Sequence, residues 1–360
     1  MAIGRMIPPL DAGAMDRARQ RQAQLTKPAG ALGRLEERAV QIAGLTGSPR
    51  PGHRRKLVIV FAGDHGVTRE GVSAYPSAVT AQMVLSFVRG TAAVAVLARA
   101  AGARLVVVDV GVDEDLAPGL PIDHRKVRPG TDSFVDGPAM ARSEAVAAMH
   151  VGAAVVADRL SEGIDLLALG EMGIGNSTAA AAVAAVLLGA DPAQVVGRGT
   201  GVDDDGLRRK IAAVRRGVEA NRPDANDPVG VLAAVGGLEI AALGGAMLRA
   251  AAARVPILLD GYIAGVAALA AARLSPAARP YFVAAHRSPE HGHRLVLAAL
   301  GLRPLLELDM RLGEASGAAL ALSLVEAALA AHDGMATFAE AGVCGQVEPA
   351  GFGASPSTAG

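Results

Sequence analysis

The sequence has few of the residues that cross-link or stack. Cys344 is the only cysteine among 360 residues, so neither an intrachain disulfide nor a thiolate metal cluster can form. There is no tryptophan and aromatic residues make up 2% of the chain, so the core and any ligand pocket must consist mainly of aliphatic side chains. This cysteine usage fits a reducing compartment, and we expect a cytoplasmic protein.

The chain also lacks net charge and a membrane-type segment. Lys+Arg and Asp+Glu both number 35, and no basic stripe is interleaved with aromatics, so we expect no nucleic-acid partner. The N-terminus has no apolar stretch of signal-peptide length. The alanine-rich runs Ala179–Ala190 and Ala318–Ala331 are shorter than the roughly 18 residues that a span needs. We therefore expect no membrane association, and interpret these runs as closely packed buried helices.

Short β-branched runs recur along the chain, each followed by a turn that contains glycine or an acidic residue. Helix-length segments rich in Ala, Leu and Val separate them. Strands without polar alternation in a βαβα order predict a doubly wound, Rossmann-like α/β fold with a parallel sheet buried on both faces. Ligands bind such sheets beyond the carboxyl ends of the strands. The predicted strands are Lys56–Ala62, Arg104–Val110, Asp165–Leu169, Gln194–Val196, Val255–Leu259 and Tyr281–Ala285.

The two ends of the chain predict a second, smaller unit. Residues 1–45 have apolar side chains at helical spacing, and a long Ala/Leu helix is expected from about Glu314 to Ala331. We expect these helices to pack together as a small helical subdomain, in which residues 306–344 join residues 1–45. The large α/β domain would then span residues 46–305, and the Gly/Pro/Ser-rich residues 345–360 would be a disordered tail.

Two glycine-rich segments are candidate phosphate sites. In Gly170–Thr178 (GEMGIGNST), Gly175, Asn176, Ser177 and Thr178 would present backbone N–H groups and hydroxyls at a helix N-terminus, where an anion is favoured. The alternative is an ordinary βα turn. The second segment, Gly197–Gly201 (GRGTG), leads into a predicted helix over Asp205–Ala220. There Lys210 flanks the buried stripe and could reach a phosphate, or it could be a solvated lysine.

Two glutamates are candidates for acid–base chemistry. Glu314 lies among small residues (MRLGEASGA), and a glutamate in an apolar site has a raised pKa and can act as a base near neutrality. The alternative is a first-turn glutamate that complements the helix dipole. Glu171 has the same ambiguity. Two acids converging on one pocket would favour a functional role.

No metal or cofactor motif is present. Five acids and histidines follow strands without H-E-x-x-H spacing or another compact ligand set, so they are interpreted as surface or turn-stabilising residues. The Walker lysine motif and a properly placed G-x-G-x-x-G are also missing, which argues against ATP and NAD. We expect neither a metal nor a cofactor. The five residues are Asp64, His65, His286, His291 and His293.

Seven stretches together resemble the nicotinate-nucleotide–dimethylbenzimidazole phosphoribosyltransferase family, in the family's order and over nearly the whole chain apart from the tail. They are TKPAGALGRLE (Thr26–Glu36), GDHGVTREGVSAYP (Gly63–Pro76), GEMGIGNST (Gly170–Thr178), VGGLEIAALGG (Val235–Gly245), LLDGYIAG (Leu258–Gly265), AAHRSPEHG (Ala284–Gly292) and MRLGEASGAAL (Met310–Leu320).

The resemblance implies a homodimer with a six-stranded parallel sheet and a small helical domain. It also implies a reaction in which nicotinate mononucleotide and 5,6-dimethylbenzimidazole give α-ribazole 5′-phosphate and nicotinate during cobalamin assembly. By motif, Glu314 matches the general base and Glu171 a second acid. Lys210 and the N–H groups around Gly175–Thr178 match the phosphate region. Met172, Leu312 and Gly313 flank the two acids and are assigned to the same substrate pocket.

The acceptor pocket is the part where family members differ. The segment GVSAYPSAVTAQMV should border it, and here it supplies Tyr75 and Met83. Tyr75 could stack on or hydrogen-bond an aromatic base, or be a turn residue before Pro76. Two other functions stay open: a related transferase that acts on another azole or a phenolic base, and a noncatalytic nucleotide-binding homologue.

Overall fold

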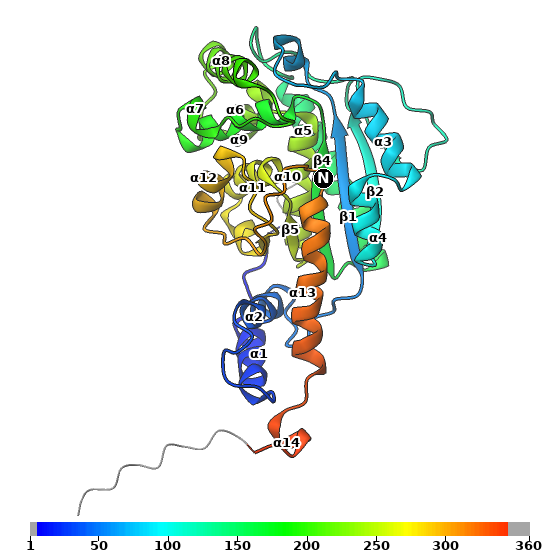
Figure 1. The fold of residues 1–360 in the computed structure, drawn as a ribbon, viewed down its shortest axis with the longest axis vertical. Helices are drawn as coiled ribbons and strands as arrows, with labels where there is room; N and C mark the ends of the chain where they lie inside the picture. The colour runs from blue at the N-terminus through cyan, green and yellow to red at the C-terminus, as the bar shows by residue number, and fades with distance from the viewer. Residues whose placement is uncertain (1–5, 345–360) are drawn as a thin grey trace, which may run out of the picture.

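The computed structural model describes residues 6–344. Its centre is a sheet of six parallel strands in the order β3-β2-β1-β4-β5-β6, which confirms the predicted doubly wound α/β fold (Figure 1). The order reverses between β1 and β4, and a ligand crevice is expected at the carboxyl ends of strands beside such a reversal. The strands are β1 (Lys56–Gly63), β2 (Arg104–Gly111), β3 (Asp123–His124), β4 (Leu166–Met172), β5 (Ile257–Leu259) and β6 (Phe282–Ala284).

Five of the six predicted strands are confirmed, and one is wrong. Residues Gln194–Val196 belong largely to the helix α7 (Pro192–Val195). Asp191 caps this helix in a capping box with Gln194, and proline occupies its first turn, so local capping overrides the β-branched pair. The sixth strand is instead β3, two residues long and not β-branched. Strand β4 also runs three residues beyond its predicted end at Leu169, so Glu171 and Met172 end the strand rather than belong to the turn.

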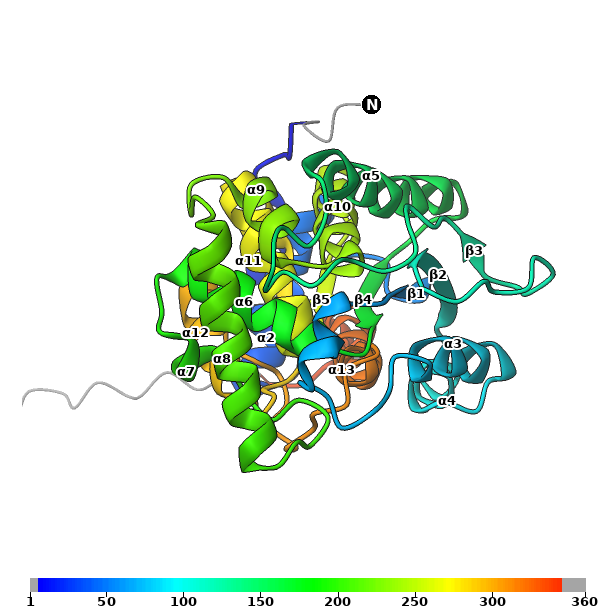
Figure 2. The ribbon, with the colours of Figure 1, turned by 90° about the horizontal axis from the view of Figure 1, so that it is seen from above.

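Helices cover both faces of the sheet (Figure 2). On one face α10 packs against β1, β2 and β4, with α5 beside it, whereas α3, α4 and α13 cover the opposite face. Helices α6, α11 and α12 extend the layers towards β6. The helices are α1 (Ala12–Gln24), α2 (Arg34–Thr46), α3 (Val79–Arg89), α4 (Ala93–Ala100), α5 (Arg142–Arg159), α6 (Asn176–Leu188), α7 (Pro192–Val195), α8 (Asp204–Asn221), α9 (Pro228–Val235), α10 (Leu238–Ala252), α11 (Tyr262–Leu274), α12 (His291–Leu300), α13 (Ser316–Gly334) and α14 (Phe338–Ala341), and 3₁₀ turns span Gly66–Glu70, Leu160–Glu162 and Pro276–Tyr281.

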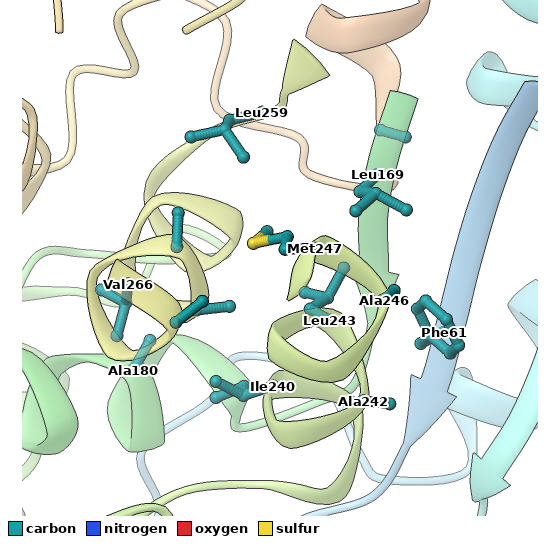
Figure 3. Packing of buried hydrophobic residues seen from close by; sticks show 14 of the residues in the cluster. Phe61, Leu169, Ala180, Ile240, Ala242, Leu243, Ala246, Met247, Leu259 and Val266 are labelled. Atoms are coloured by element: carbon teal, nitrogen blue, oxygen red, sulfur yellow. The ribbon is translucent and has the colours of Figure 1, made fainter. Parts of the chain in front are cut away.

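The core consists of small aliphatic side chains, as expected. Figure 3 shows Leu243 and Met247 of α10 between the strands and α11. Helices α5 and α10 approach so closely that only glycine fits at two positions. A Cβ at Gly152 would lie 1.8 Å from the Ala242 carbonyl oxygen, and a Cβ at Gly245 would lie 1.9 Å from that of Met149. The pair therefore packs backbone against backbone.

The terminal helices pack together at the far end of α13, which runs from the carboxyl edge of the sheet to α1 and α2 (Figure 1). Arg21 of α1 donates hydrogen bonds to three carbonyl groups at the end of α13, and Gln22 lies 2.8 Å from the His332 ring nitrogen Nδ1. The expected helical subdomain and its boundaries at residues 45, 305 and 344 stay a prediction, and the expected disordered tail, residues 345–360, lies outside the described residues.

One segment has the length and apolar composition of a membrane span. It is Val79–Ala100, of which the structure makes two helices, α3 and α4. Gly90 ends α3 in the left-handed conformation, and both helices pack on the sheet, so the segment is no continuous helix. Core helices of soluble proteins also meet this length and composition criterion.

Candidate active site

A cavity of about 620 Å³ opens at the carboxyl ends of β4, β5 and β6. Six segments far apart in sequence line it, and each follows a strand or precedes a helix, which is where a doubly wound fold brings distant loops together. Nine of the twelve residues predicted for the site line this cavity: Tyr75, Met83, Glu171, Met172, Asn176, Ser177, Leu312, Gly313 and Glu314. Of the other three, Gly175 belongs to the turn that carries Asn176 and Ser177, and Thr178 and Lys210 are buried next to Ser177.

The Gly173–Ser177 turn forms one wall of the cavity. Gly175 adopts a left-handed φ of 96° and precedes α6, whose first residue is Asn176. No side chain caps this helix, and the N–H groups of Asn176 and Thr178 donate to the carbonyls of Gly173 and Gly175. Thr178 is fully buried behind the wall. Ser177 is therefore the residue of this turn whose hydroxyl is best placed for an anion.

Lys210 lies behind Ser177. Its side chain is 1% exposed, so the alternative of a solvated lysine is wrong. The ammonium donates a hydrogen bond of 2.9 Å to the Ser177 hydroxyl. Burial lowers the pKa of Lys210 to about 8, an effect that the nearby negative charge of Glu290 opposes. A buried cation bound to a hydroxyl on the cavity wall forms a site for an anionic group.

The Gly197–Gly201 loop covers this cation. Gly199 lies so close that a Cβ there would be 2.8 Å from the Lys210 Nζ and 2.6 Å from the Ser177 Oγ. The Gly199 N–H donates a 2.9 Å hydrogen bond to the Glu290 carboxylate, which fixes the loop. The helix that follows, α8, matches its predicted span to within one residue at each end.

Glu314 lies on the opposite wall, in a strained turn. Glu314 and Ala315 have φ values of 63° and 64°, and α13 begins only at Ser316. The expected start of the helix at Glu314 is therefore two residues early, and the alternative of a first-turn glutamate on the helix dipole is wrong. The turn rests on β4, where a Cβ at Gly170 would lie 2.1 Å from the Ala315 nitrogen. A non-glycine residue held in the left-handed region costs free energy, which functional sites often tolerate.

The environment of Glu314 suits a base. Its side chain is 5% exposed, and Oε2 is buried without a hydrogen-bond partner in the described part of the chain. Burial and the charge of Asp260 raise the pKa of Glu314 to about 7. A carboxylate poised in this way can accept a proton near neutral pH.

Glu171 lies next to this turn. A Cβ at Gly313 would come within 2.8 Å of its Oε1, and Asn176 donates a short hydrogen bond to its Oε2. Burial, followed by the charges of Glu239 and Asp260, raises the pKa of Glu171 well above its ordinary value, against the Asn176 hydrogen bond. These surroundings favour the protonated form of Glu171, and the two glutamates have different environments in one cavity.

Several residues at or beside the cavity were not assigned to the site from sequence. Asp260, buried next to the cavity-lining Gly261, accepts a 2.9 Å hydrogen bond from the Ala318 N–H and lies 3.7 Å from the His286 ring nitrogen Nε2. His286, Glu290 and Arg311 line the cavity. Asp260 and His286 come just after strands in the sequence, which places them at the carboxyl edge of the sheet. The sequence pattern does not say which strands lie next to each other, so it could not bring these two residues together.

The histidines considered above as surface residues are largely buried: His65, His286 and His293 are inside the protein, whereas His291 is exposed. Within residues 6–344, no group of three or more His, Cys, Asp or Glu side chains is arranged to hold a metal ion. The expected independence from metal and cofactor remains a prediction. Tyr75 is 53% exposed and lines the cavity, and its N–H also donates to Ser73 in a turn, so both proposed roles for it remain open.

Known proteins share this chain's sequence and fold. A family model described as phosphoribosyltransferase matches residues 7–343. The chain belongs to this phosphoribosyltransferase family. A relative from Roseiflexus sp. (strain RS-1), named nicotinate-nucleotide–dimethylbenzimidazole phosphoribosyltransferase, is 55% identical over 342 residues, covering 95% of this chain and 97% of the relative. A relative of the same name from Geobacter sulfurreducens is 50% identical over 337 residues, covering 93% and 95%.

A solved structure supports the same assignment. The crystal structure of a protein of that name from Thermus thermophilus matches with a TM-score of 0.88 and 47% sequence identity. The match covers 94% of this chain and 100% of the other. At this identity the likeness extends beyond the fold, so the cavity at the carboxyl edge is the place to look for phosphoribosyl transfer.

Proposed function

We propose that the protein transfers the phosphoribosyl group of nicotinate mononucleotide to 5,6-dimethylbenzimidazole, giving α-ribazole 5′-phosphate and nicotinate in cobalamin biosynthesis. The observation that carries this proposal is the pairing of two groups in one cavity: Glu314, whose pKa is raised to about 7, and the buried Lys210–Ser177 pair. The relatives' names supply the substrates, and the residues supply a base and an anion site.

The arrangement suits a direct displacement. One nitrogen of the benzimidazole attacks C1′ of the ribose while the bond from C1′ to the nicotinate nitrogen breaks, and its electron pair stays with the departing pyridine. The configuration at C1′ changes from β to α because attack and departure are on opposite faces. Glu314 accepts the proton of the second benzimidazole nitrogen, which makes the attacking nitrogen more nucleophilic. Nicotinate leaves from a cationic ring, so no strong acid is required.

The remaining assigned residues bind and orient the substrates in this proposal. Lys210 and Ser177 hold the phosphate, with the Gly175–Thr178 turn as its wall, and so fix the ribose relative to the base. Met83, Met172, Leu312 and Gly313 form an apolar site for the aromatic acceptor, with Tyr75 at its entrance. The raised pKa of Glu171 favours its neutral form, which would add no negative charge against a substrate that carries a phosphate and a carboxylate.

We propose that the enzyme is a cytoplasmic homodimer. Leu312 and Tyr75 are apolar or aromatic residues at the cavity, yet they are 55% and 53% exposed in a single chain. A second copy that covers this rim would remove them from water. Light scattering during size-exclusion chromatography should give about twice the 36.2 kDa chain mass, and a monomer at micromolar concentration would contradict the dimer.

The test of the function is to mix the purified protein with nicotinate mononucleotide and dimethylbenzimidazole and to measure free nicotinate. Release that depends on both substrates supports the proposal. Folded protein that releases none would overturn it, and a noncatalytic nucleotide-binding homologue would then be favoured if the nucleotide still binds. A panel of azole and phenolic bases separates dimethylbenzimidazole transfer from a related transferase, because the proposed acceptor should have the highest kcat/KM.

A further inference from the structure

A buried pair of ionisable residues lies beneath the cavity and does not line it. His65 follows β1, and Glu239 is in the first turn of α10. The His65 Nε2 and the Glu239 Oε1 are 2.8 Å apart, and their side chains are 1% and 0% exposed. Removing ionisable groups from water costs free energy, and the same pair at the surface would avoid this desolvation cost. The location of this pair therefore calls for an explanation.

Glycines surround the pair. A Cβ at Gly237 would lie 2.3 Å from the His65 ring carbon Cε1, and a Cβ at Gly173 would lie 3.3 Å from its Nε2. A Cβ at Gly175 would lie 3.3 Å from the Cβ of His65, and a Cβ at Gly63 would lie 3.3 Å from the Glu239 Oε2. The imidazole is thus in close contact with the Gly173–Gly175 turn, which carries Asn176 and Ser177 into the cavity.

The Glu239 charge also acts on the cavity. After burial, it is the largest cause of the raised pKa of Glu171, ahead of Asp260 and Glu314, whereas the hydrogen bond from Asn176 acts in the opposite direction. The cavity also contains the ionisable residues Glu290, His286 and Arg311. A carboxylate placed behind Glu171 on α10 therefore favours its protonated form.

We propose that His65 and Glu239 are positioning residues for the transfer: their hydrogen-bonded pair supports the Gly173–Gly175 turn from below, and Glu239 places a negative charge behind Glu171. The two effects are separable. The hydrogen bond holds the nucleotide-binding wall in place, and the charge favours the protonated form of Glu171, which can donate a hydrogen bond and does not repel an anionic substrate. This inference rests on the proposed function.

The chain offers a matched control for the charge. Glu326 of α13 forms an ion pair with Lys56, the first residue of β1, whereas Glu239 pairs with His65 just beyond the other end of the same strand. E326Q and E239Q each remove one carboxylate charge from a buried or partly buried pair and keep an oxygen acceptor. Only E239Q removes a charge behind Glu171.

The experiment measures kcat against pH with nucleotide saturating, so that Lys210 ionisation has little influence. If the transfer needs protonated Glu171, kcat falls at the pH where Glu171 loses its proton, and without the Glu239 charge that pH is lower. The alkaline decrease of kcat (the alkaline limb) in E239Q should therefore occur at lower pH than in the wild type, while E326Q matches the wild type. A folded E239Q with the wild-type limb would overturn the proposal, because a merely structural pair would not move it.

The second measurement separates the hydrogen bond from the charge. Glu239→Asp keeps the charge, but its shorter side chain falls short of His65, so the KM for nicotinate mononucleotide should rise about tenfold with the alkaline limb unmoved. E239Q, which retains an acceptor for His65, should raise this KM by less than about threefold. An unchanged KM in E239D would contradict the proposal that the His65–Glu239 hydrogen bond supports the turn. If E239Q fails to fold, the KM of E239D alone decides this point.

Failure of the proposed function is distinguishable from failure of this inference. If the wild type releases no nicotinate, the proposed function is wrong, and calorimetric binding of the mononucleotide to E239D and E326Q still tests the support of the turn. If the wild type is active and E239Q behaves as E326Q, only the inference on the pair is wrong.

Discussion

At the scale of single residues, the site depends on two groups whose ionisation burial has shifted towards neutral pH. Glu314 and Lys210 have pKa values of about 7 and about 8. Sequence pattern could nominate both but could not decide between function and their ordinary alternatives. The deciding facts are tertiary. The loop over Lys210 is held by a hydrogen bond from Gly199 to Glu290, and the left-handed turn at Glu314 packs on Gly170 of β4.

Glu314→Gln tests the base. Because the amide cannot accept the benzimidazole proton, kcat should fall by about 10²- to 10⁴-fold, while the KM for the nucleotide changes little. In the wild type, kcat should fall as the pH drops through about 7, where Glu314 becomes protonated. Steady-state release of nicotinate from pH 5.5 to 9 checks both points. Turnover of the variant within about tenfold of the wild type would remove Glu314 from this role.

Lys210→Ala tests the phosphate site. The variant loses the ammonium that lies behind Ser177, so the KM for nicotinate mononucleotide should rise at least about tenfold. Wild-type kcat/KM should also decline above pH about 8 as Lys210 loses its proton. Arg208→Ala is the matched control on the same helix, because the Arg208 side chain is 71% exposed and should leave the KM unchanged. Equal KM values in the two variants would contradict the assignment.

At the scale of elements, strands and long helices follow from sequence better than short ones. The fully buried runs of β1 and β4 and the amphipathic stripe of α8 have clear periods. The two-residue β3 has no such signal, and α7 carries a strand-like Val195-Val196 pair that its capping box overrides. The sequence predicted closely packed helices but not that α5 and α10 are the two that cross, because a run of small residues does not identify the helix that packs against it.

Gly245→Ala tests that crossing. The new methyl group would lie 1.9 Å from a backbone oxygen of α5, so the helices must separate, and the free energy of unfolding should fall by about 1–3 kcal/mol or more. Gly244→Ala on the same helix meets nothing closer than 3.9 Å and should be neutral or slightly stabilising, because alanine favours helix. Urea denaturation compares the two, and equal stabilities would contradict the close approach.

At the scale of the whole molecule, the raised pKa of Glu314 couples activity to stability. The pKa is about 7 in the folded protein, against an ordinary value of 4.5. Between these pH values the folded chain holds a proton that the unfolded chain has released, so Glu314 lowers stability as the pH rises through this window. Glu314→Gln should therefore raise the free energy of unfolding by on the order of 2–3 kcal/mol at pH 8, but hardly at pH 4.

Urea denaturation of the wild type and Glu314→Gln at the two pH values measures this difference. A stabilisation of equal size at both would mean that proton linkage is not its source. An inactive variant that is more stable than the parent only above pH about 5 would show that the site retains its base at the expense of stability.

The late position of Glu314 in the chain also determines when the complete site can form during protein synthesis. Glu171 and Ser177 emerge from the ribosome near the middle of the polypeptide, but the turn before α13 is one of the last parts of the described chain to be made. A nascent chain that ends before residue 310 lacks both Glu314 and the helix that packs on β4 and β5. On the proposed mechanism it has no proton acceptor, and catalysis begins only when the final long helix docks.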